Sequence, residues 1–430
     1  LLAKMREKIK KLKGNKLVKD YSVTLLFSGL NAVVSFGLFK LVFNEFGEDE
    51  FYRFSMLKRL LGFLLPLSLL GLAVSLSKSV SKDVLNKKRH STLLMASLIL
   101  GFGLPLLSLF LYLFAPSFVS QLFWSSSSTE DIKLSFSLIF YIFSLVIGTL
   151  TYSVFRGQMK FLQASILEFF NLSIFPILGF LFASDLFQFI LYMSTGVFVL
   201  NILLFFILLF KHQPNLSQIK PNSSELISFG LPRLPGDFAF YFLLALPAII
   251  GIRIYSGEVA GVISFGISLL ALTQVVLQPV GVISLTRAVH LIHSEQLPQL
   301  KKETFGTLKI MLGFSFLLLI AEFLFLDIFI ELFFDSNFLK HGFIFRTMIL
   351  AIPSLTVFYS LRGVIDAYYH KPIVGNISLV SILFFGLCAG PIYFFELDLV
   401  YFLISFVLSL FLLSILCFFY TRKIFSQEAK

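Results

Sequence analysis

Long apolar runs separated by short polar gaps dominate the hydrophobic pattern of this sequence. A helix needs about 20 apolar residues to cross the hydrocarbon core of a bilayer, so each run predicts one membrane-spanning helix. The gaps carry turn formers and charges, as in Asn44–Glu50 and Ser125–Asp131, and are too short for a further domain. The twelve runs lie at roughly 21–43, 54–77, 91–114, 132–155, 161–183, 187–210, 226–250, 259–284, 305–326, 343–361, 373–395 and 399–420.

Composition supports the same fold class. Of the 430 residues, 57% are hydrophobic and 14% are charged, whereas soluble domains are about 45–50% apolar and about 25% charged. The only cysteines, Cys388 and Cys417, lie inside apolar runs, which excludes a disulfide-stapled scaffold. We therefore expect an all-α polytopic membrane protein with about 12 transmembrane helices.

The basic residues predict the orientation of the spans. Twenty-five of the 35 Lys and Arg residues lie in the two tails and in every second gap, whereas the other gaps hold only Arg53, Arg253 and Lys340. The positive-inside rule then predicts that both termini, residues 1–20 and 421–430, are cytoplasmic. The net charge of +11 is explained without a nucleic-acid partner, because the basic residues are spread along one membrane face.

Two short matches indicate an internal repeat. Ser75–Val80 resembles Ser284–Val289, and Tyr152–Gly157 resembles Tyr359–Gly363, at nearly the same offset and at equivalent cytoplasmic boundaries. We expect two six-helix halves, and because six is even, they are parallel repeats around a central cavity. The halves are 21–211 and 226–420, joined by a cytoplasmic linker at 212–225. Alternating access by rocking of one half against the other is the natural motion of this arrangement.

Charged side chains inside the predicted spans are candidate functional residues. A charge at a helix centre costs roughly 2.5–3.5 kcal/mol on insertion scales, so it usually faces a wet cavity or a partner. Lys40, Lys58 and Arg59 lie near the outer margins of the first two spans, where they either snorkel or face a cavity. Glu168 and Glu322 are the most isolated acids, which makes them candidate proton or cation sites for coupling. Alternatively, each is a helix-interior acid that is protonated or paired with a basic residue.

The seventh span begins with an unusual segment, Ser228–Asp237. Its two prolines, Pro232 and Pro235, should kink or break the helix. A break beside Arg233 would offer free amides and a positive charge to an anionic head group. Alternatively, Arg233 and Asp237 form a structural ion pair at i, i+4. Both interpretations stay open, whereas for Arg362 and Asp366, which have the same spacing, we expect the structural pair.

Motifs for enzymatic chemistry are missing from the sequence. No Walker A sequence and no nucleophile motif occurs, so we expect neither an ATPase nor another enzyme, and no catalytic residue. His290 and His293 lie three residues apart in a loop, but no nearby third ligand supports a metal site. We predict no cofactor and no metal.

Two segments, together with the twelve spans, carry a family resemblance. They are Phe229–Phe238 at the start of the second half and Leu361–Ala367 before Pro372, and with them the sequence resembles the O-antigen flippases (Wzx-like). These belong to the multidrug/oligosaccharidyl-lipid/polysaccharide (MOP) exporter superfamily. The resemblance implies a bacterial inner-membrane protein that translocates undecaprenyl-pyrophosphate-linked oligosaccharide, such as the O-antigen of lipopolysaccharide, to the periplasmic leaflet. Its partners would be this substrate, membrane lipid and a polysaccharide polymerase or ligase. The resemblance also implies a cationic cavity, formed here by Lys40, Lys58, Arg59 and Arg233 with Asp237.

Two other functions are weighed against this one. A cation-coupled drug or metabolite antiporter of the same superfamily would need an acidic binding cluster, and the basic excess inside the spans argues against it. A membrane-embedded polysaccharide polymerase or transferase would carry a large external loop or an intramembrane His/Asp set. The longest external segment, Ala115–Asp131, is short and serine-rich.

Overall fold

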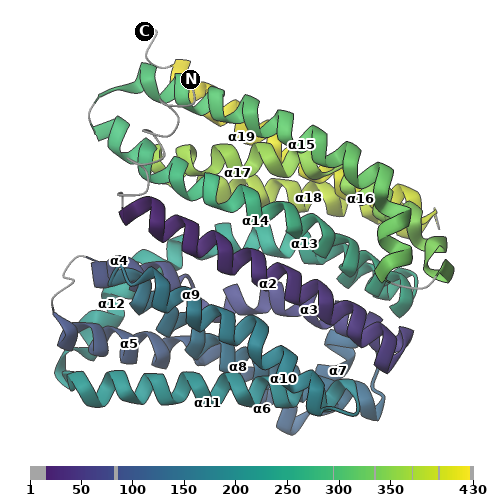
Figure 1. Ribbon diagram of the computed structural model, residues 1–430, viewed down its shortest axis with the longest axis horizontal. Helices are drawn as coiled ribbons and strands as arrows, with labels where there is room; N and C mark the ends of the chain where they lie inside the picture. Colours follow the sequence, from purple (N-terminus) through teal and green to yellow (C-terminus); the bar gives the residue numbers. More distant parts are fainter. Residues whose placement is uncertain are drawn as a thin grey trace, which may run out of the picture. The chain divides into compact units, whose positions relative to one another are not determined.

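The computed structural model describes residues 16–81, 86–293, 295–333, 336–369, 371–395 and 398–426, and the regular structure within them is entirely helical (Figure 1). Most of the predicted N-terminal tail and the end of the C-terminal tail lie outside these ranges. The helices of the N-terminal part are α2 (Lys16–Phe46), α3 (Glu48–Leu69), α4 (Leu72–Ser81), α5 (Lys87–Gly101), α6 (Gly103–Phe114), α7 (Pro116–Trp124), α8 (Thr129–Gly157), α9 (Phe161–Phe169), η1 (Phe170–Ile174), α10 (Phe175–Phe182), α11 (Leu186–His212), η2 (Leu216–Gln218) and α12 (Ile219–Gly230). The C-terminal part consists of η3 (Leu231–Arg233), α13 (Leu234–Ile254), α14 (Gly257–His293), α15 (Leu297–Phe333), η4 (Ser336–His341), α16 (Gly342–Ile349), α17 (Ile352–Tyr368), α18 (Ile373–Phe394) and α19 (Leu399–Ser426).

Helix length and composition confirm the prediction of an all-α multi-pass membrane protein. Among the described residues, 10 helical segments are long and apolar enough to cross a membrane, and the bent pair α3 and α4 makes an eleventh. Helix α14 has 37 residues, which is also long enough to span a bilayer. With α14 included, the helices agree with the twelve predicted spans.

The first compact unit comprises residues 1–38, 68–116 and 132–230. Its central helix is α8, because 78% of the most apolar stretch of that helix is buried, compared with 28% in α11. Helices α10 and α11 pack along each other, and α12 packs on α4 and α5 (Figure 1). The unit therefore surrounds one buried helix with more exposed ones.

A pair of buried asparagines lies in the interior of this unit. The side-chain amide of Asn201 on α11 donates to the Asn171 Oδ1 atom at 2.9 Å and to the Val197 carbonyl at 2.7 Å. Asn171 lies in η1, a π-helical turn that interrupts the helix formed by α9 and α10. Gly148 of α8 makes room for the pair, since a Cβ there would lie 2.8 Å from the Asn171 amide nitrogen. Each buried amide thus has a hydrogen-bond partner where hydrocarbon offers none.

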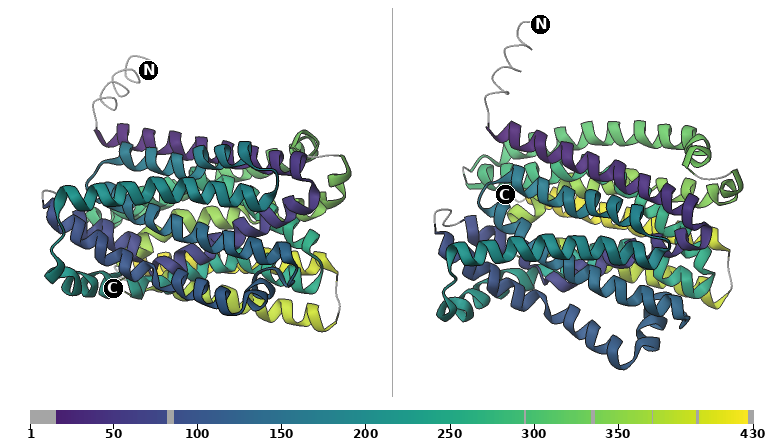
Figure 2. Two further views of the ribbon diagram at one scale, coloured as in Figure 1. Left: turned by 90° about the horizontal axis from the view of Figure 1, so that it is seen from below. Right: turned by 60° about the horizontal axis from the view of Figure 1, so that its bottom comes forward.

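The second compact unit comprises residues 39–67, 117–131 and 231–430. The stretch Phe338–Tyr368, which includes α16 and α17, is its buried centre, again with 78% of the most apolar part buried. Helix α17 packs on α14, α15 and α19, and these helices lie nearly parallel (Figure 2). This centre is the tenth predicted span and α8 is the fourth, which are equivalent positions in two six-span repeats.

Aromatic rings join the ends of α2 and α3 to the rest of the second unit. The Phe39 ring centroid lies 5.1 Å from those of Phe54 and Phe265, and the Phe51 ring centroid lies 5.5 Å from that of Phe338. Edge-to-face pairs at these distances add to the stabilisation from burial. Residues 39–67 thus pack with α14 and η4, although the sequence places them in the first half. The two compact units group residues that lie close in space and do not follow the limits of the predicted sequence repeats. The predicted domain limits therefore stay a prediction.

The break between α3 and α4 bends the chain by 50°. Leu70 and Gly71 have φ values of 50° and 72°, and the carbonyl oxygen of Gly230 occupies the place that a Cβ at position 71 would need. Directly after the bend, the Ser75 hydroxyl donates to the Leu226 carbonyl of α12 at 2.9 Å. Glycine is therefore required at position 71 both by the backbone conformation and by the approach of α12.

We predict that Gly71→Ala lowers the melting temperature of the detergent-purified protein by at least a few degrees. The left-handed φ costs about 1–2 kcal/mol for an L-residue, and the added methyl group would overlap the Gly230 backbone. Gly103→Ala is the matched control, because a Cβ there meets no atom within 4 Å. Equal melting temperatures for the Gly71→Ala variant and the wild type would contradict this account of the bend.

Candidate functional site

A cavity of about 490 Å³ lies in the first unit, among α5, α8, α9 and α11. Its polar lining consists of Lys87, Gln158, Lys160, Gln163, Lys211 and His212. Its apolar lining consists of Phe155, Ile166, Leu167, Phe170, Leu200, Leu204, Ile207 and Leu208. We call this cavity the lysine groove, because lysines from three different helix ends lie at its polar end.

Among the described residues, no acid neutralises the positive charge of the lysine groove. No described Asp or Glu lines the cavity, and within the same ranges Lys87, Lys160 and Lys211 form no ion pair. His212 interacts electrostatically with all three lysines, so the three cationic groups and the imidazole share one neighbourhood. Like charges held this close repel, and an anion bound among them relieves that repulsion.

The start of α9 adds to this positive field. The chain leaves α8 at Gly157, where a Cβ would lie 2.7 Å from the Ser77 carbonyl, and turns at Met159 with φ 57°. Helix α9 then starts at Phe161, and Lys160 caps it without a side-chain hydrogen bond. The first amides of a helix have no intrahelical acceptor and carry the positive end of the helix dipole. The turn therefore places donors and a lysine at the same edge of the groove.

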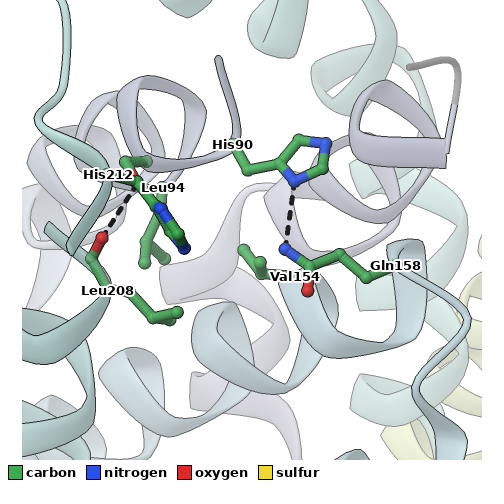
Figure 3. A pocket seen from close by; sticks show the side chains of 7 residues that line it. His90, Leu94, Val154, Gln158, Leu208 and His212 are labelled. Carbon is green, nitrogen blue, oxygen red and sulfur yellow. Dashed lines mark hydrogen bonds between the residues drawn. The ribbon is translucent and has the colours of Figure 1, made fainter. Parts of the chain in front are cut away.

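A hydrogen bond holds one wall of the groove in place. The amide nitrogen of Gln158 on α8 lies 3.0 Å from His90 Nδ1 on α5, so the amide donates and the ring nitrogen accepts (Figure 3). Val154, Leu208 and His212 lie around this pair, without room for a water molecule between them. Gln158 and His212 are thus packed on one side and line the lysine groove on the other.

The opposite end of the groove is open and apolar. Ile166, Phe170 and Ile207 line it and are exposed on the surface of the unit. In a membrane protein, exposed apolar side chains on the middle of long helices face lipid. The groove therefore combines an apolar wall accessible to lipid with a cationic end, which is a suitable arrangement for an amphipathic anion with a long apolar chain.

Comparison with known proteins assigns the family. A family model described as polysaccharide biosynthesis protein matches residues 17–286, which is more than half of the chain. The chain belongs to the polysaccharide biosynthesis protein family. No match was found among curated proteins.

Solved structures agree with this family at the level of the fold. One is a MOP superfamily transporter from Pyrococcus furiosus, with 16% identity, coverage of 97% of this chain and 98% of that chain, and a TM-score of 0.67. A multidrug resistance MATE family transporter in an outward-facing conformation has 13% identity, 97% coverage of each chain and a TM-score of 0.67. The eukaryotic MATE transporter AtDTX14 has 14% identity, coverage of 96% of this chain and 100% of that chain, and a TM-score of 0.64. This polysaccharide biosynthesis family member therefore has the fold of the MOP superfamily transporters, as its sequence resemblance implied.

Arg59, one of the predicted cavity cations of this family member, connects two helices of the second unit. Its Nη2 atom donates to the Ser264 carbonyl and to the Ser268 hydroxyl on α14, both at 3.1 Å. The neighbouring Lys58 Nζ atom lies 5.3 Å from the centroid of the Phe54 ring. Both side chains are half-buried. These contacts give Arg59 a structural role, and its predicted contact with substrate stays a prediction.

The structure describes the remaining predicted residues to different extents. Lys40 is half-buried on α2, and the side chains of Arg233 and Asp237 lie outside the described residues, so their proposed pair stays a prediction. The expected pair of Arg362 and Asp366 is confirmed, with 3.4 Å between the Nε and Oδ2 atoms.

The two candidate coupling acids differ in their surroundings. Glu168 is half-buried on α9 and interacts electrostatically with Arg156 at the end of α8, and both interpretations of this acid stay open. Glu322 is half-buried on α15 and makes no ion pair with the residues that the structure describes. A role in coupling stays a prediction for both.

We predict that Arg59→Met lowers the melting temperature of the purified protein more than Lys58→Met does. A hydrogen bond from a charged donor contributes about 1.5–3 kcal/mol, whereas a cation over an aromatic ring contributes about 0.5–2 kcal/mol. The two variants remove one charge each from adjacent positions, so they control for each other. An Arg59→Met variant as stable as the wild type would contradict the structural role.

Proposed function

We propose that this protein is a flippase for undecaprenyl-pyrophosphate-linked oligosaccharide in the bacterial inner membrane. The lysine groove is the observation that carries the proposal, because its cationic end, which no described acid neutralises, adjoins an apolar wall accessible to lipid. A lipid-linked oligosaccharide has the matching chemistry, with a pyrophosphate between a long isoprenoid chain and a polar glycan. The polysaccharide biosynthesis family supports this substrate class.

Charge and helix geometry account for recognition of the pyrophosphate. Lys87, Lys160 and Lys211 each contribute about 1 kcal/mol towards an anionic group near a membrane surface. Free amides in the first turn of α9 add hydrogen bonds to the phosphate oxygens. These groups lie at the end of the molecule that the positive-inside pattern assigns to the cytoplasm. Substrate made in the cytoplasmic leaflet thus meets the groove from the side on which it is synthesised.

The apolar wall accounts for selection of a lipid rather than a soluble phosphate. The first isoprene units would lie along Ile166, Phe170 and Ile207, while the rest of the chain stays in the bilayer. Each buried CH₂ group contributes about 0.8 kcal/mol. Lys40 and Lys58 are candidate contacts for the oligosaccharide.

Translocation needs no covalent chemistry. Two states of the protein that bind the head group with different affinity are sufficient to move it between leaflets by alternating access. A polysaccharide polymerase or ligase would then take the product at the periplasmic face. The alternative function, cation-coupled drug antiport, would require an acidic binding site, and no acid among the described residues lines the lysine groove.

We predict that the combined variant Lys87→Gln, Lys160→Gln and Lys211→Gln transports about a hundredfold more slowly at limiting substrate. Loss of about 3 kcal/mol of attraction corresponds to that factor. The measurement follows a fluorescent lipid-linked oligosaccharide in proteoliposomes, read out by an external quencher.

The control for this variant removes the same charge elsewhere. Lys220, Lys301 and Lys302 are exposed and lie outside the groove, on the same predicted membrane face. The triple change of these residues to Gln should leave the rate unchanged. Equal rates for the two triple variants would refute a role of the groove, and export of a cationic dye without lipid transport would favour the antiporter.

Filling the apolar wall should also slow transport. The combined variant Ile166→Trp and Leu204→Trp narrows the groove, so we expect the rate to fall at least about tenfold, which corresponds to about 1.4 kcal/mol. Val199→Trp and Leu203→Trp add the same rings to exposed positions of α11 that do not line the groove. Binding of inorganic pyrophosphate should be unchanged in both, because the cationic end is intact. Full transport by the filled variant would exclude the apolar wall from the substrate path.

A further inference from the structure

Three side chains that commonly bind metal ions meet in the second unit, away from the lysine groove. Glu48 is the first residue of α3, Glu258 lies in the first turn of α14, and His341 ends η4. One ligand atom from each residue lies within 4.8 Å of the other two. Two carboxylates and one imidazole form a ligand set that suits divalent transition-metal ions such as Zn²⁺.

The imidazole of His341 is buried and faces the Glu258 carboxylate. The residue is only 7% exposed, and its Nε2 atom makes no well-aligned hydrogen bond among the described residues. That atom lies 3.1 Å from Glu258 Oε1. Ligand atoms that share one tetrahedral zinc ion, each at about 2.0–2.1 Å from it, lie about 3.3 Å apart. The two atoms are thus close enough to share an ion.

Packing fixes the ring of His341. The Phe338 ring centroid lies 5.2 Å from that of the imidazole, in an edge-to-face arrangement. The Tyr52 hydroxyl donates to Glu48 Oε1 and orients that carboxylate. Such supporting contacts around the ligands are typical of metal sites and tune their affinity.

A lysine at the cluster already supplies a positive charge. The Lys340 Nζ atom lies 2.9 Å from Glu258 Oε1 and 3.9 Å from Glu48 Oε1. Its side chain is 55% exposed, so it can withdraw into solvent without loss of packing. The two carboxylates therefore hold a cation in common, and a metal ion with a higher charge would compete with the ammonium group for them.

We propose that Glu48, Glu258 and His341 bind one divalent transition-metal ion of the Zn²⁺ class, with water completing its coordination and Lys340 acting as an internal competitor. The ion would link α3 to α14 and η4 and so stabilise the end of the second unit that the charge pattern assigns to the periplasm. This site is separate from the lysine groove in its residues and in its chemistry. The proposal does not depend on the identity of the transported substrate.

The test uses the purified full-length protein, with its affinity tag removed and its metals stripped by a chelator. Titration with ZnCl₂, followed by calorimetry and by melting temperature, should give one Zn²⁺ ion per chain and a higher melting temperature. His341→Gln and Glu258→Gln should each weaken binding at least about tenfold, since each removes a ligand. Lys340→Met should tighten binding several-fold, because the competing ammonium group is gone. His212→Gln and Lys220→Met serve as matched controls and should bind as the wild type does.

The opposite responses of the ligand and lysine variants distinguish a metal site from a structural ion pair. If Glu258→Gln fails to fold, His341→Gln and Lys340→Met still give the two opposite changes. The proposal is overturned if the wild type and the Lys340→Met variant both bind no stoichiometric Zn²⁺. It is also overturned if Lys340→Met weakens binding, or if binding is the same in the His341→Gln variant and the wild type. Tighter binding of CaCl₂ than of ZnCl₂ would contradict the assigned metal class.

Discussion

Hydrocarbon solvates neither a charge nor a free backbone amide, and the arrangement of this chain depends on that constraint. Buried amides are paired, as Asn171 is with Asn201. Two charged side chains of the helices have partners too, since Arg59 donates to α14 and Arg346 Nη2 lies 2.6 Å from Asp327 Oδ2. The three lysines of the groove differ from these, because no described acid lines the cavity that they share.

Helix α9 connects two consequences of this constraint. Its first turn faces the lysine groove, where free amides can bind an anion instead of water. At its other end it continues into the π-helical turn that holds Asn171. π-helical turns are uncommon and often occur at functional sites. Helix α9 thus connects the cationic end of the groove to the buried asparagine pair. A substrate bound in the groove would therefore affect the interior of the unit through α9.

The fold could be predicted from the sequence to a large extent, because the bilayer imposes one period and one length on every span. The apolar runs gave the helices, and turn formers such as those in Asn44–Glu50 marked their ends. The bend at Gly71 could not be predicted, since it depends on the backbone of Gly230 far along the chain. The proximity of Glu48 and Glu258 could not be predicted either, because nothing in the local sequence of either residue indicates the other.

The site was less predictable for a related reason. Lys87, Lys160 and Lys211 follow the positive-inside pattern, so sequence reasoning assigned them to topology alone. Only the packing of α5, α8, α9 and α11 brings them to one cavity. Conversely, Arg59 stood out as a charge inside a span, and its Nη2 atom donates hydrogen bonds to Ser264 and Ser268 of the fold itself. Whether a charged side chain serves the fold or binds substrate depends on the groups that contact it, and the sequence does not show these contacts.

The most direct test of the lysine groove is photochemical labelling by a polyprenyl pyrophosphate that carries a diazirine next to the phosphates. The full-length protein would be irradiated in liposomes with this probe, and the labelled residues would be mapped by mass spectrometry. The account predicts adducts within residues 155–170 and 200–212, reduced when unlabelled polyprenyl pyrophosphate competes. Competed adducts confined to other helices, such as α15 or α18, would contradict it.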